Sequence, residues 1–542
     1  MDDLPRRAED RAIHLPIRRN RGRLWKRSGQ AAAVIGVGDN MDVTYNVQVQ
    51  VGGTLTPLII DTGSSDLWIR SDRCNDHCPI TGVPLYSQAS FTPTGQDIQL
   101  LYGDSYTGTH ATGMIGTDTV SIAGMAVPGQ YFAAVADTNT TVLETGSAGI
   151  LGLGFPPISL IWRQLLASGS HQTMPSLPKR SLSDYILTLT SALRNTGSMP
   201  ERRDSSLTHP VDSFPTLGPL LTRLVTWKVL ERPLVVATLQ RDTISFSSND
   251  GTLSLGALPF GLSDDRLTWV PVRTYSVTEG GLPPPPGAPS EVYPLVWEVP
   301  IDEVYFDGVK LPRSTLSPPS VGLSALVDTG NSLIRGPQDV LAYISSQLNL
   351  DSAGTFDCAN AHNLTFIIGG GQFPVDPRDF AHPAAVVPGT RYPAEAARCT
   401  PALAATDPPG AGGFLYSWSL GDPFLKSTMA AFYYGNMTHP SQDPARIGFM
   451  SMVPSDATYA LEEAVDAAIA DGGVFLSTSE PAPYATALRL AGTMASTADE
   501  PRMTQGSPRA SSRAAPRLRP GASLWMYALM IVLYTGILAD VL

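Results

Sequence analysis

The sequence contains little of several residue types that often indicate a function. It has four cysteines and eight histidines in 542 residues, and charged residues make up only 16%. Successive cysteines are separated by 3, 279 and 40 residues, spacings that match no zinc-ligand pattern. There is no Gly-x-Ser-x-Gly motif and no partner pattern among the histidines, which argues against serine or cysteine nucleophiles. We expect neither a metal nor a cofactor.

Positive charge is scarce except at the two ends of the chain. Residues 1–27 carry nine Lys and Arg against four acidic residues, and residues 501–542 carry five Arg against one Asp. The whole chain has a net charge of −12, so the body between these ends carries about −21. Such a body would be repelled by nucleic acid. We therefore expect no nucleic-acid partner. The body would lose much of its self-repulsion in acid, so we also expect acidic working conditions.

The residues that are abundant favour strands and turns. The chain has 49 Gly and 47 Pro, and it is long enough for two or more domains with large cores. From Val43, apolar Tyr45, Val47, Val49 and Val51 alternate with polar residues, which predicts a half-buried strand. The composition therefore favours strands and turns over helices.

One short phrase occurs twice. Residues 58–65 read LIIDTGSS and residues 325–332 read ALVDTGNS, with the two aspartates 267 positions apart. A single Asp-Thr-Gly is usually a turn. However, placing a carboxylate at the end of a buried strand is costly, and it happens here twice with matching apolar lead-ins. The repeat predicts two halves that bring Asp61 and Asp328 together.

Further elements accompany these phrases. Residues 148–156 read AGILGLGFP, and residues 419–424 read SLGDPF in the second half. Residues 101–104 read LYGD and lead into a strand-like run at 112–120. Together with the two Asp-Thr-Gly phrases, they resemble the pepsin-like aspartic proteases, and in particular the fungal secreted or cell-surface (yapsin-like) type. The resemblance covers roughly residues 43–453, excluding a predicted insertion at residues 169–213. It implies a bilobal all-β fold, in which two β-barrel-like lobes have the active-site cleft between them.

The same resemblance implies the site. Asp61 and Asp328 would act as an acid endopeptidase dyad that shares one proton around a water molecule, because like charges so close cannot both ionise easily. Ser64 would hydrogen-bond one carboxylate, whereas its counterpart Asn331 departs from the usual Thr or Ser. The dyad-supporting residues are Thr62, Gly63, Ser64, Thr329, Gly330 and Asn331, and the flap residues are Tyr102, Gly103 and Asp104. Substrates would be proteins or peptides, and the enzyme would be a monomer.

Cysteines and glycosylation motifs point to the secretory pathway. The cysteines form two local pairs, Cys74 with Cys78 and Cys358 with Cys399, and relatives often have a disulfide at the first pair. Asn-x-Ser/Thr motifs begin at Asn139, Asn363 and Asn436. Paired cysteines together with these motifs favour an oxidising compartment and an extracellular or cell-surface location.

The chain divides into five predicted segments. They are a basic arm or propeptide remnant (1–27), an N-terminal lobe (28–260) with an insertion at 169–213, a C-terminal lobe (261–453), a linker rich in Ser, Thr, Pro and Ala (454–522), and a hydrophobic tail (523–542). The insertion is either a surface loop or a translated intron, since structureless loops of this length are uncommon. No apolar signal region occurs in residues 1–27, so we expect a signal segment upstream.

The apolar tail has two interpretations. Its basic flank lies on the N-terminal side, which argues against a simple spanning helix with the enzyme outside. The small residues 510–512, a polar spacer at 513–522 and the tail fit a signal for a glycolipid (GPI) anchor. A retained transmembrane helix is the alternative, and either would attach the protein to a membrane.

Two rival functions stay open. A catalytically silent relative would bind peptides in the same cleft, although both Asp-Thr-Gly phrases and Tyr102 are intact. A structural cell-surface glycoprotein would account for the Ser/Thr/Pro-rich tail and the glycosylation motifs, but not for the paired phrases.

Overall fold

The computed structural model describes residues 30–490, apart from gaps at 41, 75–77, 79–81, 104–107, 170–208, 243, 245–250, 385–396, 411–413, 476–478 and 484–486. All of the described residues belong to one contact unit. The predicted arm at 1–27, most of the predicted insertion and the predicted tail at 523–542 lie outside the described residues. The proposed segment boundaries stay predictions.

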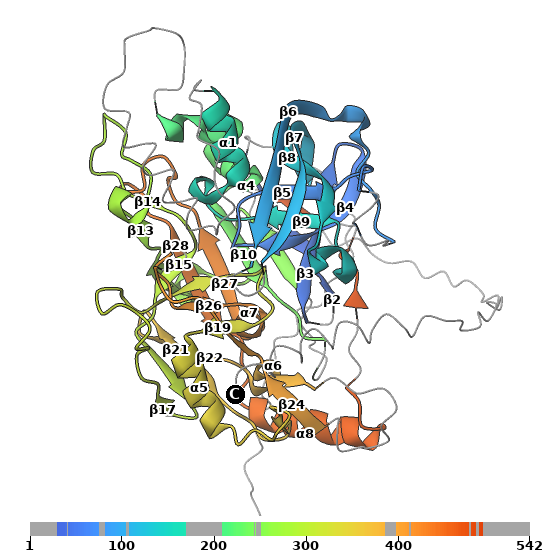
Figure 1. Cartoon of the computed structure of the whole chain (residues 1–542), viewed down its shortest axis with the longest axis vertical. Helices are drawn as coiled ribbons and strands as arrows, with labels where there is room; N and C mark the ends of the chain where they lie inside the picture. The colour runs from blue at the N-terminus through green and yellow to red at the C-terminus, as the bar shows by residue number, and fades with distance from the viewer. Residues whose placement is uncertain are drawn as a thin grey trace, which may run out of the picture. The chain divides into compact units, whose positions relative to one another are not determined.

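The N-terminal half is built on a nine-stranded sheet in the order β29-β2-β3-β4-β9-β5-β8-β7-β6, in which β2 to β9 are blue to teal in Figure 1. Its strands are β2 (Gly38–Asn40), β3 (Thr44–Val51), β4 (Thr54–Asp61), β5 (Leu67–Arg70), β6 (Thr92–Tyr102), β7 (Thr109–Ile122), β8 (Met125–Thr138), β9 (Gly149–Gly152) and β29 (Ser479–Glu480). An additional pairing of β3 with β7 closes the ring β3-β4-β9-β5-β8-β7. This ring is the predicted barrel-like lobe.

The C-terminal half contains smaller sheets, with the orders β15-β18-β26-β19-β25, β17-β16-β21-β22, β20-β24-β23 and β13-β14. Their strands are β13 (Thr274–Tyr275), β14 (Tyr293–Pro294), β15 (Glu298–Pro300), β16 (Glu303–Phe306), β17 (Val309–Lys310), β18 (Ser324–Val327), β19 (Ile334–Gly336), β20 (Phe356–Asp357), β21 (Leu364–Ile368), β22 (Gly371–Pro374), β23 (Ala381–Pro383), β24 (Arg398–Pro401), β25 (Leu403–Ala405) and β26 (Trp418–Leu420).

A seven-stranded sheet combines strands from both halves in the order β12-β28-β27-β10-β11-β1-β30. Its strands are β1 (Ala31–Gly36), β10 (Leu234–Thr238), β11 (Thr252–Leu255), β12 (Thr268–Pro271), β27 (Thr428–Tyr433), β28 (Arg446–Ser451) and β30 (Ala487–Leu490). Because β10 pairs with β27, the two halves share backbone hydrogen bonds. The predicted all-β, bilobal fold is confirmed.

Helices are short and lie between the strands. They are α1 (Leu160–Gly169), α3 (Phe214–Leu217), α4 (Leu220–Thr226), α5 (Gln338–Gln347), α6 (Pro377–Phe380), α7 (Asp422–Ser427) and α8 (Ala457–Ala470). Within the described ranges, no helix has the length and apolar character needed to span a bilayer.

Aromatic side chains join the halves at the centre of the core. Trp297 packs against Phe155 with ring centroids 4.4 Å apart and against Tyr434 at 4.9 Å. The indole N–H of Trp297 and the hydroxyl of Tyr434 both donate to the Leu153 carbonyl, at 3.0 and 2.6 Å. The core therefore continues from one half into the other.

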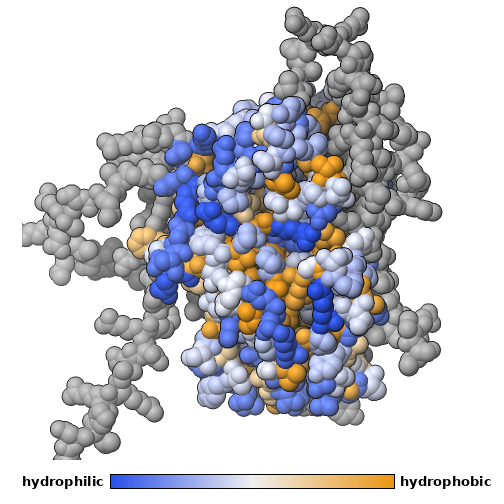
Figure 2. Space-filling model, turned by 90° about the vertical axis from the view of Figure 1, so that its left-hand side faces the viewer, coloured by the Kyte–Doolittle hydropathy of each residue, from blue (hydrophilic) through white to orange (hydrophobic). Residues whose placement is uncertain are grey.

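Apolar residues also reach the surface, and they gather across the middle of the face shown in Figure 2.

The first part of the predicted linker at 454–522 is folded. Helix α8 buries Leu461, Val465 and Ala468, which recur on one face at helical spacing. After it, β29 pairs with β2 and β30 pairs with β1, so the chain returns to its own N-terminal strands. The segment therefore adds an amphipathic helix and two edge strands to the fold.

This return also changes the environment of β3. Its alternating pattern predicts polar side chains in water, yet Asn46 and Gln48 are only 4% and 9% exposed. The Gln48 side-chain amide donates to the Ala482 carbonyl at 3.2 Å, and Ala482 is buried. The strand is therefore more buried than its pattern predicts, because a segment far along the chain covers Gln48, whereas Gln50 of the same face stays exposed.

A glycine permits this close packing and provides a test. A Cβ atom at Gly38 would lie 2.3 Å from the Ala482 nitrogen, whereas one at Gly53 would meet nothing within 4 Å. We expect Gly38→Ala to lower the free energy of unfolding by about 1–3 kcal/mol through overpacking. Gly53→Ala, in the neighbouring hairpin, is the matched control for denaturant unfolding. Equal effects of the two substitutions would contradict the packing of residues 479–483 on β2.

Candidate active site

The two Asp-Thr-Gly loops are built on the same strand pattern. Strand β4 pairs in parallel with β9, β9 runs antiparallel to β5, and β5 is parallel to β8. The second half repeats this order with β18, β26, β19 and β25. Asp61 ends β4 and Asp328 directly follows β18. The segments 148–156 and 419–424 thus occupy equivalent places beside the two loops, as their sequences predict.

Glycines let each neighbouring segment lie directly against its loop. A Cβ atom at Gly152 would lie 2.4 Å from the Ser65 carbonyl carbon, and one at Gly421 would lie 2.0 Å from the Asn331 carbonyl oxygen. Any other residue would push the backbones apart. The Leu153 N–H donates to the Asp61 carbonyl at 2.7 Å, and the Asp328 N–H donates to Leu420 at 3.0 Å. Both loops are therefore fixed from behind.

Two threonines connect the loops across the interface between the halves. The N–H of Thr62 donates to Thr329 Oγ1, and the N–H of Thr329 donates to Thr62 Oγ1, both at 3.0 Å. Each hydroxyl then donates to the opposite strand, Thr62 to Val327 and Thr329 to Ile60, both at 2.8 Å. Both threonines are 1% exposed. This reciprocal set fixes the separation of the two aspartates.

Asp61 and Asp328 face each other across the loop glycines. A Cβ atom at Gly63 would lie 2.5 Å from Asp328 Oδ1, and one at Gly330 would lie 2.4 Å from Asp61 Oδ1. Each carboxylate therefore lies over the glycine of the opposite loop, and only glycine leaves room for it. Asp61 is 6% exposed and Asp328 is partly buried.

The two carboxylates receive different donors. Asp61 accepts the Gly63 N–H at 2.8 Å and the Ser64 hydroxyl, whereas Asp328 accepts the Gly330 N–H at 2.9 Å. Burial raises the pKa of Asp61, but the Ser64 and Gly63 donors oppose the rise. Burial and the negative charge of Asp61 raise the pKa of Asp328 well above its usual range. The geometry favours the proton on Asp328 and the negative charge on Asp61.

Asn331 does not mirror Ser64 in its contacts. Its Nδ2 donates to Ser419 Oγ at 2.9 Å, and its Oδ1 accepts the Leu333 N–H at 3.2 Å and Arg335 Nε at 3.3 Å. The carboxamide thus ties the loop to β26 and β19. Arg335 is a further residue of the site, which the sequence motifs do not indicate. The available signal was one basic residue within the apolar and small residues that follow the second Asp-Thr-Gly.

The flap residues lie at the end of the β6–β7 hairpin. Tyr102 pairs with Thr109, and its ring centroid lies 6.4 Å from that of Trp68. Burial, followed by the negative charges of Asp66 and Asp61, raises the pKa of Tyr102, so its hydroxyl keeps its proton. Gly103 has a φ of 87°, a conformation that favours glycine. The third predicted flap residue, Asp104, lies outside the described residues.

Asp66, which directly follows the first Asp-Thr-Gly phrase, has a structural role. Its carboxylate accepts the Ser159 hydroxyl and the N–H groups of Leu160 and Ile161, at 2.8 and 3.2 Å for the two amides. It therefore caps the start of α1. Burial raises the pKa of Asp66 to about 6 despite these donors.

Both predicted cysteine pairs, Cys74–Cys78 and Cys358–Cys399, are disulfide-bonded. Asn139 and Asn363 are exposed. Asn436 is partly buried, and its Nδ2 donates to Gln442 Oε1 at 3.3 Å. The first two positions are therefore more accessible to glycosylation than the third.

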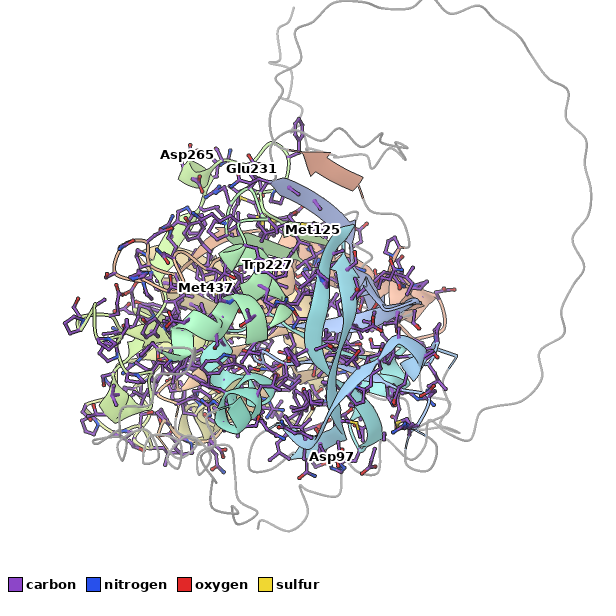
Figure 3. The ribbon with its side chains drawn as sticks, turned by 90° about the horizontal axis from the view of Figure 1, so that it is seen from above. Asp97, Met125, Trp227, Glu231, Asp265 and Met437 are labelled. Carbon is purple, nitrogen blue, oxygen red and sulfur yellow. A yellow bond between two sulfur atoms is a disulfide. The ribbon has the colours of Figure 1, made fainter. Side chains whose placement is uncertain are left out.

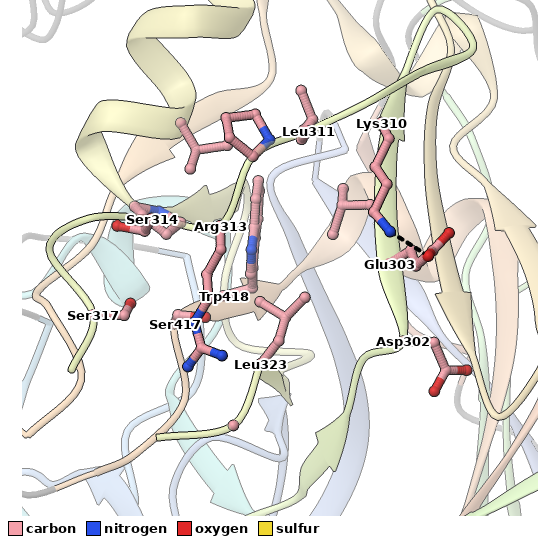
Figure 4. Close-up of a pocket in the computed structure, with 15 residues that line it drawn as sticks. Asp302, Glu303, Lys310, Leu311, Arg313, Ser314, Ser317, Leu323, Ser417 and Trp418 are labelled. Carbon is pink, nitrogen blue, oxygen red and sulfur yellow. Dashed lines mark hydrogen bonds and ion pairs between the residues drawn. The ribbon is translucent and has the colours of Figure 1, made fainter. Parts of the chain in front are cut away.

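A cavity of about 210 Å³ lies in the C-terminal half, and neither Asp61 nor Asp328 lines it (Figure 4). Its lining includes Trp418, Leu323 and two cations. Lys310 pairs with Glu303, and Arg313 donates to the carbonyl of Val321. Both cations are therefore engaged within the protein, and the chemistry of the paired carboxylates lies elsewhere.

Comparison with known proteins identifies relatives of this arrangement. The family model described as "Eukaryotic aspartyl protease" matches residues 44–169 and 219–439. Cathepsin E of Mus musculus is 25% identical over 410 residues, covering 73% of this chain and 79% of the relative. Pepsin A of Sus scrofa is 25% identical over 431 residues, covering 75% and 84%. Gastricsin of Callithrix jacchus is 25% identical over 422 residues, covering 73% and 81%.

Proposed function

Because this chain belongs to the eukaryotic aspartyl protease family, we propose that it hydrolyses internal peptide bonds of proteins in acid through Asp61 and Asp328. The observation that carries the proposal is the reciprocal placement of each carboxylate over the other loop's glycine. The yapsin-like subtype suggested by the sequence stays a prediction, since the relatives compared here are cathepsin E, pepsin A and gastricsin.

In the proposed mechanism, the two carboxyl groups start with one proton between them. Asp61, which accepts more hydrogen bonds, removes a proton from a water molecule as its oxygen attacks the substrate carbonyl carbon. Asp328 gives its proton to the carbonyl oxygen. As the C–N bond breaks, Asp61 gives the proton that it took from water to the leaving nitrogen. Asp328 takes a proton back from a hydroxyl of the tetrahedral intermediate, so the product is a carboxylic acid and the dyad is again singly protonated. Thr62 and Thr329 keep the two groups in position.

The surrounding residues have supporting roles in this proposal. The Tyr102 hydroxyl, which retains its proton, is suited to donate a hydrogen bond at the substrate side of the flap, next to Gly103. A role for Asp104 stays a prediction. The disulfides and the exposed Asn139 and Asn363 support a secreted or cell-surface enzyme with glycans at these two positions. Membrane attachment through the C-terminus and a monomeric state stay predictions.

The proposal is tested with purified protein and an unfolded protein substrate between about pH 2 and pH 8, a span that brackets carboxyl titration. We expect cleavage at internal bonds in acid, its loss at the alkaline end, and inhibition by pepstatin. Mass spectrometry of the products separates endopeptidase from terminal cleavage. Saturable peptide binding without product at any pH would instead identify a catalytically silent relative.

A further inference from the structure

The strand after the second Asp-Thr-Gly loop carries a cation at a position where the first half has a tryptophan. Arg335 lies on β19, where it pairs in register with Ser419 of β26. Its Nε donates to Asn331 Oδ1 at 3.3 Å, and its Nη1 donates to the Ala405 carbonyl at 3.4 Å. In the first half, the residue in the equivalent register is Trp68 of β5, which pairs with Ile150 of β9, and the cation of that strand, Arg70, lies two residues further on. The arginine is thus a difference between two otherwise similar loops.

The same Asn331 ties this cation to the turn that contains Asp328. The Asn331 N–H donates to the Asp328 carbonyl at 3.3 Å, so Asp328 and Asn331 are the two ends of one tight turn. Asn331 is also the residue that accepts the hydrogen bond from Arg335. Asn331 Nδ2 is anchored on Ser419, which fixes the direction of its Oδ1 toward Arg335. A serine or threonine at position 331 could not donate to Ser419 and accept from Arg335 with the same reach.

Three ionisable groups interact with Asp328 from the elements around it. Asp61 faces it from the end of β4, and Asp422 lies at the start of α7, where burial raises the pKa of its carboxyl group and favours the neutral form. Arg335 is the positive group among those that act on Asp328, and its charge lowers the pKa of this residue against the effects of burial and of Asp61. A cation held on this loop therefore offsets part of the cost of ionising the dyad.

We propose that Arg335 is a positioning residue of the reaction, which Asn331 holds beside the Asp328 loop so that its charge limits how tightly the dyad keeps its shared proton. This inference rests on the proposed function for its kinetic consequence, but its electrostatic content does not require catalysis. Arg335 acts through Asp328 and is not itself assigned a proton-transfer step.

The first test is the pH dependence of kcat/KM for the wild type, Arg335→Gln and Arg335→Lys. Loss of the cation should raise the pKa of Asp328, so the alkaline limb of Arg335→Gln should move up by roughly 0.5–1 pH unit. Arg335→Lys should stay near the wild type, and Asn331→Ser should move part of the way. Added salt should shift the wild-type limb upward and leave that of Arg335→Gln almost unchanged, because screening acts on the cation.

The second test needs no activity. The free energy of unfolding is measured against pH for proteins with Asp328 and with Asp328→Asn, in both the wild-type and the Arg335→Gln backgrounds. The difference between the two proteins of each background isolates the contribution of Asp328. A raised pKa makes Asp328 lose its stabilising contribution as pH rises from the unfolded value toward the folded one. That loss should extend to higher pH without Arg335. If this difference depended on pH in the same way in the two backgrounds, the inference would be overturned. Inactivity of the wild type would overturn only the proposed function. Arg232→Gln, at a partly exposed pair with Asp264, is the control.

Discussion

Replacing either Asp61 or Asp328 with Asn should abolish peptide hydrolysis while the protein stays folded. In the proposed mechanism each carboxyl group exchanges a proton with water, substrate or leaving group. Asn cannot do this, and single proton-transfer roles contribute about 10²–10⁴-fold to a rate. Because each aspartate serves in more than one step, we expect losses at or above the upper end of that range. The measurement is kcat/KM on an internally cleaved peptide at the acid optimum.

The same variants should be at least as stable as the wild type. Asn keeps an oxygen that can accept the Gly63 or Gly330 N–H, so the loops retain these hydrogen bonds. Asp328 has a raised pKa because burial and the charge of Asp61 oppose its ionisation. The wild type therefore loses stability as pH rises above the unfolded pKa, and Asp328→Asn should remove that loss.

Asp265→Asn is the matched control for these two variants. Asp265 is exposed on a surface turn, at the edge of the view in Figure 3. Its activity and its unfolding curve should match those of the wild type. Residual activity in Asp61→Asn within tenfold of the wild type would contradict the assigned base, even if Asp328→Asn were inactive.

The sequence predicted those parts of the fold and site that depend on local patterns. An apolar strand ending in Asp-Thr-Gly needs few neighbours to be recognised, and its repetition predicted that Asp61 and Asp328 would meet. The glycines at 152 and 421 belong to the same kind of signal, because close backbone approach requires them in any context. These inferences concern residues whose chemistry allows few alternatives.

The sequence could not predict contacts whose partners are distant and chemically ordinary. Gln48 looked solvent-exposed because its partner, the Ala482 carbonyl, lies 434 positions away. Asn331 occupies the position that corresponds to Ser64, so its side chain was expected near the dyad. Nothing in the neighbouring sequence shows that this side chain forms hydrogen bonds with Ser419 and Arg335. An alternating strand or a loop motif specifies its own conformation, but not what packs on its polar side.

A buried ion cluster is the largest feature of this second kind. Arg241 donates to both oxygens of Asp379 at 2.6 Å, and its Nη2 lies 3.4 Å from Asp376. Lys426 lies 3.2 Å from Asp42 and 3.4 Å from Asp379. The Asp376 and Asp379 side chains are 0% exposed, and those of Arg241 and Lys426 are 10% and 6% exposed. The cluster joins a turn near the N-terminus to α6 and α7 of the C-terminal half.

The charges of this cluster compensate one another, so removing one member leaves another buried and unpaired. Burial raises the pKa of Asp379, but the charges of Arg241 and Lys426 outweigh burial and lower it. A lowered carboxyl pKa contributes stability above the unfolded value of about 3.9, and this contribution is lost as pH falls through the folded value. The ion pair therefore stabilises the protein most near neutral pH.

Arg241→Met should lower the free energy of unfolding by about 3–5 kcal/mol near pH 7, because Asp379 would keep a buried charge without its bidentate partner. Below about pH 4 the loss should shrink, since protonation of Asp379 relieves the unpaired charge. Arg232→Met, at the partly exposed pair with Asp264, should cost at most about 1 kcal/mol at either pH. The double variant Arg241→Met/Asp379→Leu should recover most of the loss, because an apolar pair replaces an ion pair at little cost. A loss in Arg241→Met that is equal at pH 4 and pH 7 would show that packing of the arginine, and not its charge, stabilises this junction.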